Sequence, residues 1–163
     1  MREAFLGLLL WAGLVTPVVG GTHQVPQDES IASVVIPDKW QTQDFEDRVQ
    51  TASPDGALRL MILQPEGTKV ADAMGEVMRH IRNTGGIVVR DDSPKPEPGQ
   101  LNGMEVRNIS WQGKDAKGDV GITFSVVSVA DKKPLLVAWR GSPAAQRKYR
   151  GELDRILKSL KRL

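Results

Sequence analysis

The hydrophobic pattern is clearest towards the C-terminal end of the chain. From Asp119 to Trp139 the sequence predicts two neighbouring strands with apolar residues on both faces, a pattern typical of a sheet buried on both sides. Ser142 is the expected N-cap of a long helix reaching Leu163, and Pro143 lies in the first turn, where a proline loses no hydrogen bond. Apolar residues recur at helical spacing along this helix, at Tyr149, Leu153, Ile156, Leu157 and Leu160.

Shorter patterns upstream predict a second helix and a series of strands. Ser53–Gly56 is expected to form the tight turn of a hairpin, since proline fixes φ and glycine permits a positive φ. An apolar stripe over Thr68–Thr84 predicts the helix, with Thr68 as its cap and Gly85-Gly86 as its end. The expected strands cover residues 31–36, 45–51, 57–64, 87–90 and 102–112.

The remaining segments carry the residues of turns and loops. We expect a proline-rich loop over residues 92–99, a hairpin loop over 113–118 and a tight turn over 131–133. Within the expected strand 102–112 the alternation changes phase between Val106 and Ile109. This change predicts either a β-bulge or burial on both faces of the strand.

The first residues of the chain have the pattern of a secretory signal peptide. An apolar run covers residues 4–15, and small residues stand before a cleavage point at Gly20 or Gly21. The alternative is an uncleaved membrane anchor, but a spanning helix needs roughly 20 apolar residues. We therefore expect residues 1–21 to be removed and residues 22–30 to form a flexible N-terminus. The exported protein would be periplasmic or extracellular, with no membrane span after signal removal.

Three short motifs, together with the order of the elements, resemble the PsbP-like or Mog-type fold family. That family includes the photosystem II extrinsic protein, a Ran-binding protein and DcrB-like bacterial envelope proteins. Ile36–Trp40 is similar to the family's Pro-x-x-Trp after its first strand, Ser53–Gly56 to its next turn, and Ile156–Leu160 to its closing helix. The resemblance covers residues 31–163, which we expect to form a single PsbP-like domain.

The fold class that follows is α/β of the α+β type. We expect an antiparallel sheet of about six or seven strands flanked by two helices, in an α/β/α sandwich. The resemblance also implies a non-enzymatic binding or assembly role, because members of the family mostly bind other proteins. None of the matching motifs carries chemistry, so no functional residue is transferred from a family member.

Composition and charge narrow the class of protein further. The chain has 163 residues and no cysteine, which suits one domain and excludes disulfides, thiolate metal sites and cysteine nucleophiles. Its net charge is +2, but the charged residues are unevenly distributed along the chain. Residues 146–163 contain seven basic and two acidic residues, a net charge of +5, whereas residues 21–145 carry −3. The sequence therefore predicts a basic helix on a mildly acidic body.

No catalytic, cofactor or metal site is expected from the motifs. His80 would have to be the base of a hydrolytic triad, yet no Gly-x-Ser-x-Gly elbow accompanies it, and we interpret it as a half-exposed helix histidine. Two acidic pairs lack the regular series of oxygen ligands that a calcium loop requires. We interpret them as solvated loop residues; they are Asp91 with Asp92, and Asp115 with Asp119.

Aromatic residues do not point to nucleic acid, which is not an expected partner. We interpret Trp40, Trp111 and Trp139 as core or sheet-edge packing, because a platform for single strands needs several aromatic residues among basic ones. Asn108–Ser110 is a glycosylation sequon, but it lies within an expected strand, where use is not expected. His23 falls in the segment expected to be flexible.

The basic side of the last helix is the one candidate partner surface. One interpretation is a solvated face, with cations near the helix C-terminus stabilised by the dipole. The other is a surface for an anionic partner, which could be a protein, an anionic lipid or a nucleic acid; we expect another protein, of acidic character. The candidate residues are Arg147, Lys148, Arg155 and Lys158.

Two hypotheses about function remain open at this point. The first is an exported, non-enzymatic binding or assembly module. The second is an envelope enzyme or small-ligand-binding protein whose site the residue types do not reveal. A cleft that gathers four polar residues would favour the second; they are His80, Arg90, Asp91 and Asp92.

Overall fold

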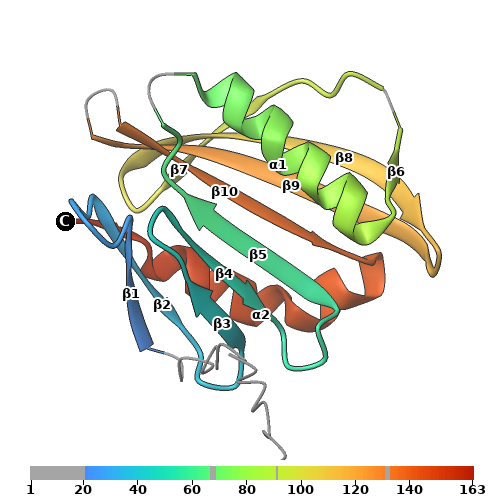
Figure 1. Cartoon of the computed structure of the whole chain (residues 1–163), viewed down its shortest axis with the longest axis horizontal. Coiled ribbons are helices and arrows are strands. Elements are labelled where there is room, and N and C mark those ends of the chain that lie inside the picture. Colours follow the sequence, from blue (N-terminus) through green and yellow to red (C-terminus); the bar gives the residue numbers. More distant parts are fainter. Residues whose placement is uncertain (1–20, 67–68, 91, 131–132) are drawn as a thin grey trace, which may run out of the picture.

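The computed structural model describes residues 21–66, 69–90, 92–130 and 133–163 (Figure 1). Thr68, Asp91, the turn at 131–132 and all of the predicted signal peptide except Gly21 lie outside the described residues. The described elements, in chain order, are β1 (Gly21–Val25), β2 (Ala32–Ile36), β3 (Gln41–Asp44), β4 (Arg48–Ala52), β5 (Leu58–Leu63), α1 (Val70–Gly85), β6 (Val88–Val89), β7 (Glu97–Leu101), β8 (Met104–Asp115), β9 (Gly118–Ala130), β10 (Lys133–Gly141), α2 (Pro143–Ser159) and β11 (Lys161–Arg162).

A large antiparallel sheet separates the two helices, as the sequence predicted. Among the described residues it has eight strands in the order β3-β4-β5-β10-β9-β8-β6, with β7 also paired to β8. Helix α1 lies on one face and α2 on the other (Figure 1). The α/β/α sandwich is therefore confirmed. The sheet has more strands than the expected six or seven, and a second sheet, β1-β2-β11, adds three.

Helix α2 starts where its sequence signals place it. The Ser142 hydroxyl accepts a hydrogen bond from the Ala145 N–H at 3.1 Å, and Pro143 is the first helical residue. The predicted apolar stripe is buried against the sheet, except that Leu157 is only partly buried. The helix ends at Ser159 rather than Leu163, because the last residues leave it to pair with β2 as β11.

Helix α1 packs on the opposite face of the sheet, and a second, smaller core lies between them. Val77 and Ile81 are buried there against residues of β8, β9 and β10, among them Phe124. Gly86 ends the helix in the left-handed conformation, with φ of 58°, as the Gly-Gly pair predicted. The helix begins after Lys69, which makes no side-chain cap.

The start of the described chain forms a strand, within the segment for which the sequence predicted a flexible N-terminus. Residues 21–25 form β1, which pairs with β2 along its whole length. His23 and Val25 alternate inward and are buried, so this short strand contributes to the core. A polar composition concealed the alternation, because the residues between them face solvent.

Two further strands were missed, both at sheet edges. Gln41–Asp44 forms β3 beside β4, and Glu97–Leu101 forms β7 within the expected proline-rich loop. Pro98 is tolerated there because β7 is an edge strand. Asn102 and Gly103, both with positive φ, make the two-residue turn from β7 to β8. The predicted strand 102–112 therefore starts at Met104.

The change of phase in β8 reflects burial on both faces. The β8–β9 ladder continues from Val106 to Asp115 without a register shift, which excludes the bulge. Val106 joins the core beneath α2, whereas Trp111 packs against the core beneath α1. The following hairpin has a two-residue turn, shorter than the loop expected over 113–118.

Candidate functional site

The four basic residues of the candidate surface are all exposed on α2. Arg147, Arg155 and Lys158 are separated by eight and three residues, so they lie on one side of the helix. The buried residues Tyr149 and Ile156 lie on the opposite side and face the sheet. The helical periodicity thus leaves a basic strip on the outer side of α2.

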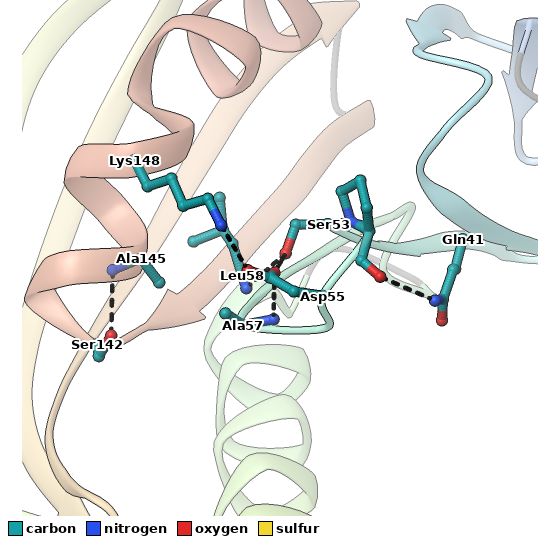
Figure 2. A network of polar contacts seen from close by, with 9 residues as sticks. Gln41, Ser53, Asp55, Ala57, Leu58, Ser142, Ala145 and Lys148 are labelled. Carbon is teal, nitrogen blue, oxygen red and sulfur yellow. Dashed lines mark hydrogen bonds and ion pairs between the residues drawn. The ribbon is translucent and has the colours of Figure 1, made fainter.

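Lys148 is exposed, and it also connects α2 to a turn of the main sheet. Its Nζ lies 3.0 Å from Oδ2 of Asp55, a residue of the turn between β4 and β5 (Figure 2). The other carboxylate oxygen of Asp55 accepts hydrogen bonds from the Ala57 N–H at 3.1 Å and the Ser53 hydroxyl at 2.8 Å. This arrangement ties the Ser-Pro-Asp-Gly turn to α2.

The same contacts shift the ionisation of both partners. The Ala57 N–H, the Ser53 hydroxyl and the Lys148 ammonium hold the pKa of Asp55 well below its ordinary value. The hydrogen bond to Asp55 raises the pKa of Lys148. The charge of Lys148 is therefore largely balanced within the chain, which the sequence did not indicate.

The other three basic residues of the candidate surface have no such ion pair with a described carboxylate. No ion pair joins Arg147, Arg155 or Lys158 to another residue of the described chain. Arg155 Nε donates to the Gly151 carbonyl on the same helix at 3.2 Å, which keeps the guanidinium close to the helix surface. Asp154 is exposed on the same helix without an ion pair to a described residue.

Glu152, the other carboxylate of α2, has two partners outside the helix. It accepts a hydrogen bond from Trp40 Nε1 at 2.6 Å and lies 2.7 Å from Lys39 Nζ. Its pKa is lowered by these contacts, first by the bond to Lys39 and then by the bond to Trp40. Trp40 is buried and meets Tyr149 edge-on, with ring centroids 5.9 Å apart. The Pro-Asp-Lys-Trp motif is thus a structural anchor for α2.

The other candidate residues that the structure describes lie at separate places on the fold. His80 is exposed on α1, at a groove that Arg90 and Asp92 do not line. Asp115 Oδ1 accepts from the backbone of its own hairpin turn, and Asp119 lies 4.0 Å from Lys114. Within the described part of the chain, no three histidine or carboxylate side chains gather as a metal site requires.

The tryptophans and the sequon have structural positions. Trp111 packs edge-on against Phe124, with centroids 5.1 Å apart, and Trp139 packs partly buried against the core under α2. Asn108 lies within β8, and its side chain accepts a hydrogen bond from Ser125 of β9. The interpretation of the tryptophans as core packing is confirmed.

Two polar pairs were not anticipated from the sequence. His23 Nδ1 lies 2.8 Å from Asp44, which joins β1 to β3, while its Nε2 is buried without a partner among the described residues. Arg59 and Arg140 face each other across the β5–β10 ladder. No motif could reveal either pair, because both depend on how strands distant in the sequence align.

The comparisons with known proteins confirm the PsbP-like fold. Cyanobacterial PsbP from Synechocystis superposes with a TM-score of 0.58 at 11% identity, over 97% of this chain and 99% of that protein. A protein from Bacteroides thetaiotaomicron gives 0.52 at 12% identity, over 89% of this chain and 49% of that chain. This chain therefore spans about half the length of the latter protein.

LpqN of Mycobacterium tuberculosis, described as involved in cell envelope biogenesis, gives a TM-score of 0.49 at 9% identity, over 88% of this chain and 91% of that chain. No model of a protein family and no curated protein matches the sequence. Similarity at these identities concerns the fold alone. No helix in the described part of the chain is long and apolar enough to cross a membrane.

Proposed function

We propose that this chain is an exported, non-enzymatic binding or assembly module that uses the outer side of α2 to capture an acidic protein partner. One observation carries the proposal. Arg147, Arg155 and Lys158 are exposed on one side of a helix and form no ion pair with the described residues. Lys148 contributes charge at the edge of this strip while it holds Asp55.

The rigidity of the helix supports a role in binding. Leu153 and Ile156 bury its inner side. The contacts of Lys148 and Glu152 fix the helix to the β4–β5 turn and to the connection between β2 and β3. Charges presented on a fixed backbone keep their spacing. Binding a partner of opposite charge therefore costs less conformational entropy than it would on a flexible segment. Exposed charges of this kind mainly accelerate encounter, and salt screens them.

The residues available for catalysis support a non-enzymatic role. The His80 ring makes no hydrogen bond to a described side chain, and the His23 ring is buried beside Asp44. Neither imidazole therefore has the exposed, oriented geometry of a general base beside a nucleophile. The resemblance to PsbP-like proteins, which mostly bind other proteins, points in the same direction.

A charge-reversal experiment tests the proposal. Wild type and a triple variant, Arg147→Glu, Arg155→Glu and Lys158→Glu, would be used to capture partners from an envelope fraction, and the binding kinetics would follow at two salt concentrations. Lys148 stays unchanged so that its contact with Asp55 is preserved. We expect the triple variant to fold and to associate much more slowly, and wild-type association to slow as salt rises.

The matched control reverses three exposed basic residues away from α2, Arg79, Arg82 and Lys117, which changes the net charge equally. This control should retain most of the association rate. If the α2 variant and the control bind the recovered partner equally well, the basic strip is a solvated surface and the proposal fails. The segment 94–99, which includes the start of β7, would then be the next surface to test.

A further inference from the structure

A groove of about 740 Å³ lies on the face of the main sheet that α1 covers only in part. Helix α1 runs over the β8–β10 side, and the β3–β5 side of the same face is left uncovered (Figure 1). His80 and Thr84 of α1 form one wall, while strand residues form the floor. Pockets that hold small molecules typically measure about 300–1,000 Å³, so the groove has room for one.

Two arginines lie side by side on the floor of this groove. Arg59 of β5 and Arg140 of β10 are directly paired in the antiparallel ladder, so their side chains leave the sheet on the same face. Like charges placed directly opposite each other destabilise a sheet. Neither guanidinium forms an ion pair with a described residue. The fold therefore holds two positive charges next to each other without an ion-pair partner among the described residues.

The Arg140 guanidinium is also held in place. It is half-buried, and a Cβ built on Gly85 at the end of α1 would lie 2.6 Å from its Nη1. The guanidinium thus packs against helix backbone, near carbonyl groups that carry the negative end of the helix dipole. Burial and the neighbouring Arg59 lower the pKa of Arg140, while the charge of Asp115 acts in the opposite direction without forming an ion pair.

The rest of the lining combines polar and apolar groups. Gln41, Gln43 and Gln50 offer amide donors and acceptors along β3 and β4. Met61 and Ala138, neighbours in the β5–β10 ladder one step further along the same face, offer apolar surface beside the arginines. A ligand that matches this lining has an anionic group at one end and an apolar body.

We propose that this groove binds a small organic anion, whose phosphate or carboxylate group is held by Arg59 and Arg140 and whose apolar part rests on Met61 and Ala138. Planar guanidinium groups bind both kinds of oxyanion through paired N–H···O hydrogen bonds. An anion between them also removes their mutual repulsion. This site lies apart from the basic strip of α2, so it does not depend on the proposed function of that strip.

Four probes separate the contributions of charge and apolar surface. Phenyl phosphate and benzoate carry both features, inorganic phosphate carries charge alone, and phenol carries the ring alone. Binding would be followed by calorimetry and by NMR of the backbone amides of the full mature chain. We expect phenyl phosphate or benzoate to bind with a Kd at or below about 1 mM, and to shift the amides of Arg59, Met61 and Arg140. Which of the two binds better decides between phosphate and carboxylate.

Arginine-to-glutamine variants test the assignment of the site. Arg59→Gln and Arg140→Gln should each weaken binding by about tenfold or more, because each removes charge-assisted hydrogen bonds to the anion. Arg82→Gln, on α1 but outside the groove lining, is the matched control and should bind as wild type does. Neither groove variant should melt at a lower temperature than wild type, since each relieves a repulsion, and this measurement confirms folding.

Three results would overturn the proposal. The first is that neither phenyl phosphate nor benzoate binds near this concentration. The second is that phenol binds as well as they do, and the third is that the groove variants bind as tightly as wild type. The α2 charge-reversal variant should still bind the small anion, and the groove variants should still capture the acidic protein partner. Failure of one proposal is therefore visible separately from failure of the other.

Discussion

The two faces of the main sheet are built differently. On one face α2 is capped by the Ser142 side chain, and its inner residues join a core that also includes the small sheet. On the other face α1 starts without a side-chain cap, covers the β8–β10 side and leaves a groove over β3–β5. One face is closed by packing, and the other leaves a groove beside its helix.

The closed face explains the motifs that carried the resemblance. The Trp40 ring and the Lys39 ammonium both reach Glu152, and Asp55 reaches Lys148. Both motifs, Pro-x-x-Trp and Ser-Pro-Asp-Gly, thus help to hold α2 on the sheet. A motif shared by proteins of one fold can therefore reflect what the fold requires, and the sites for partners must be sought elsewhere.

The first prediction tests whether α2 is the element that closes its face. Leu153→Ala should lower the free energy of unfolding by about 2–5 kcal/mol, because it leaves a cavity in the core between α2 and the sheet. Arg155→Ala, on the exposed side of the same helix, should change it by less than about 0.5 kcal/mol. Urea titrations of both variants provide the measurement. Equal small losses would show that α2 is not docked, and the contrast between the faces would disappear.

The long elements could be predicted from the sequence because apolar residues recur along each of them over several turns or residue pairs. The stripe of α2 and the strands β9 and β10 bury so much apolar surface that their pattern is legible. The short polar strands β1, β3 and β7 lack such a pattern and were not predicted. Gln41–Asp44 is polar because one side faces the open groove and Thr42, on the other side, satisfies its hydroxyl through a hydrogen bond to Thr51.

The candidate sites show the same limit. Helical spacing alone placed Arg147 and Arg155 on the exposed side of α2, and the structure agrees. The contact of Lys148 with Asp55, and the pairing of Arg59 with Arg140, depend on alignments between segments far apart in the chain. A sequence shows which residues are charged, but only the register of the strands shows which charges meet.

The second prediction concerns the C-terminal end of α2. Asn102 Nδ2 donates to the carbonyls of Lys158 and Leu160 at 2.8 and 2.6 Å, while Asn102 itself adopts a positive φ in the β7–β8 turn. Asn102→Ala should lower the free energy of unfolding by about 1–2 kcal/mol, because two carbonyls lose their donor and alanine tolerates a positive φ less well. Thermal and urea denaturation would measure the loss.

An exposed asparagine on the other helix supplies the control for this change. Asn83→Ala on α1 removes the same amide group, and it should leave stability nearly unchanged or raise it slightly, since alanine has the higher helix propensity. A loss as large as that of Asn102→Ala would contradict the view that α2 has a side-chain tether that α1 lacks. The sequence analysis placed Asn102 at the start of a strand, so it predicted neither the hairpin turn nor the contact with the helix.

The third prediction uses pH to weaken the contact between α2 and the β4–β5 turn. We expect a smaller change in the free energy of unfolding than in the first two predictions. The pKa of Asp55 is lower in the folded chain than its ordinary value, mainly through the Ala57 N–H, the Ser53 hydroxyl and the Lys148 ammonium. A carboxyl group with a depressed folded pKa stabilises the protein fully above its unfolded pKa, about 4 for aspartate, and loses this contribution as pH falls towards the folded value. Asp55→Asn should therefore be less stable than wild type at neutral pH, and the difference should shrink in acid below the unfolded pKa. Urea titrations across this range, with Asp154→Asn as a control for the removal of an exposed charge on α2, would measure it. A difference that stays constant or grows in acid would mean that the turn does not hold α2 through the charge of Asp55.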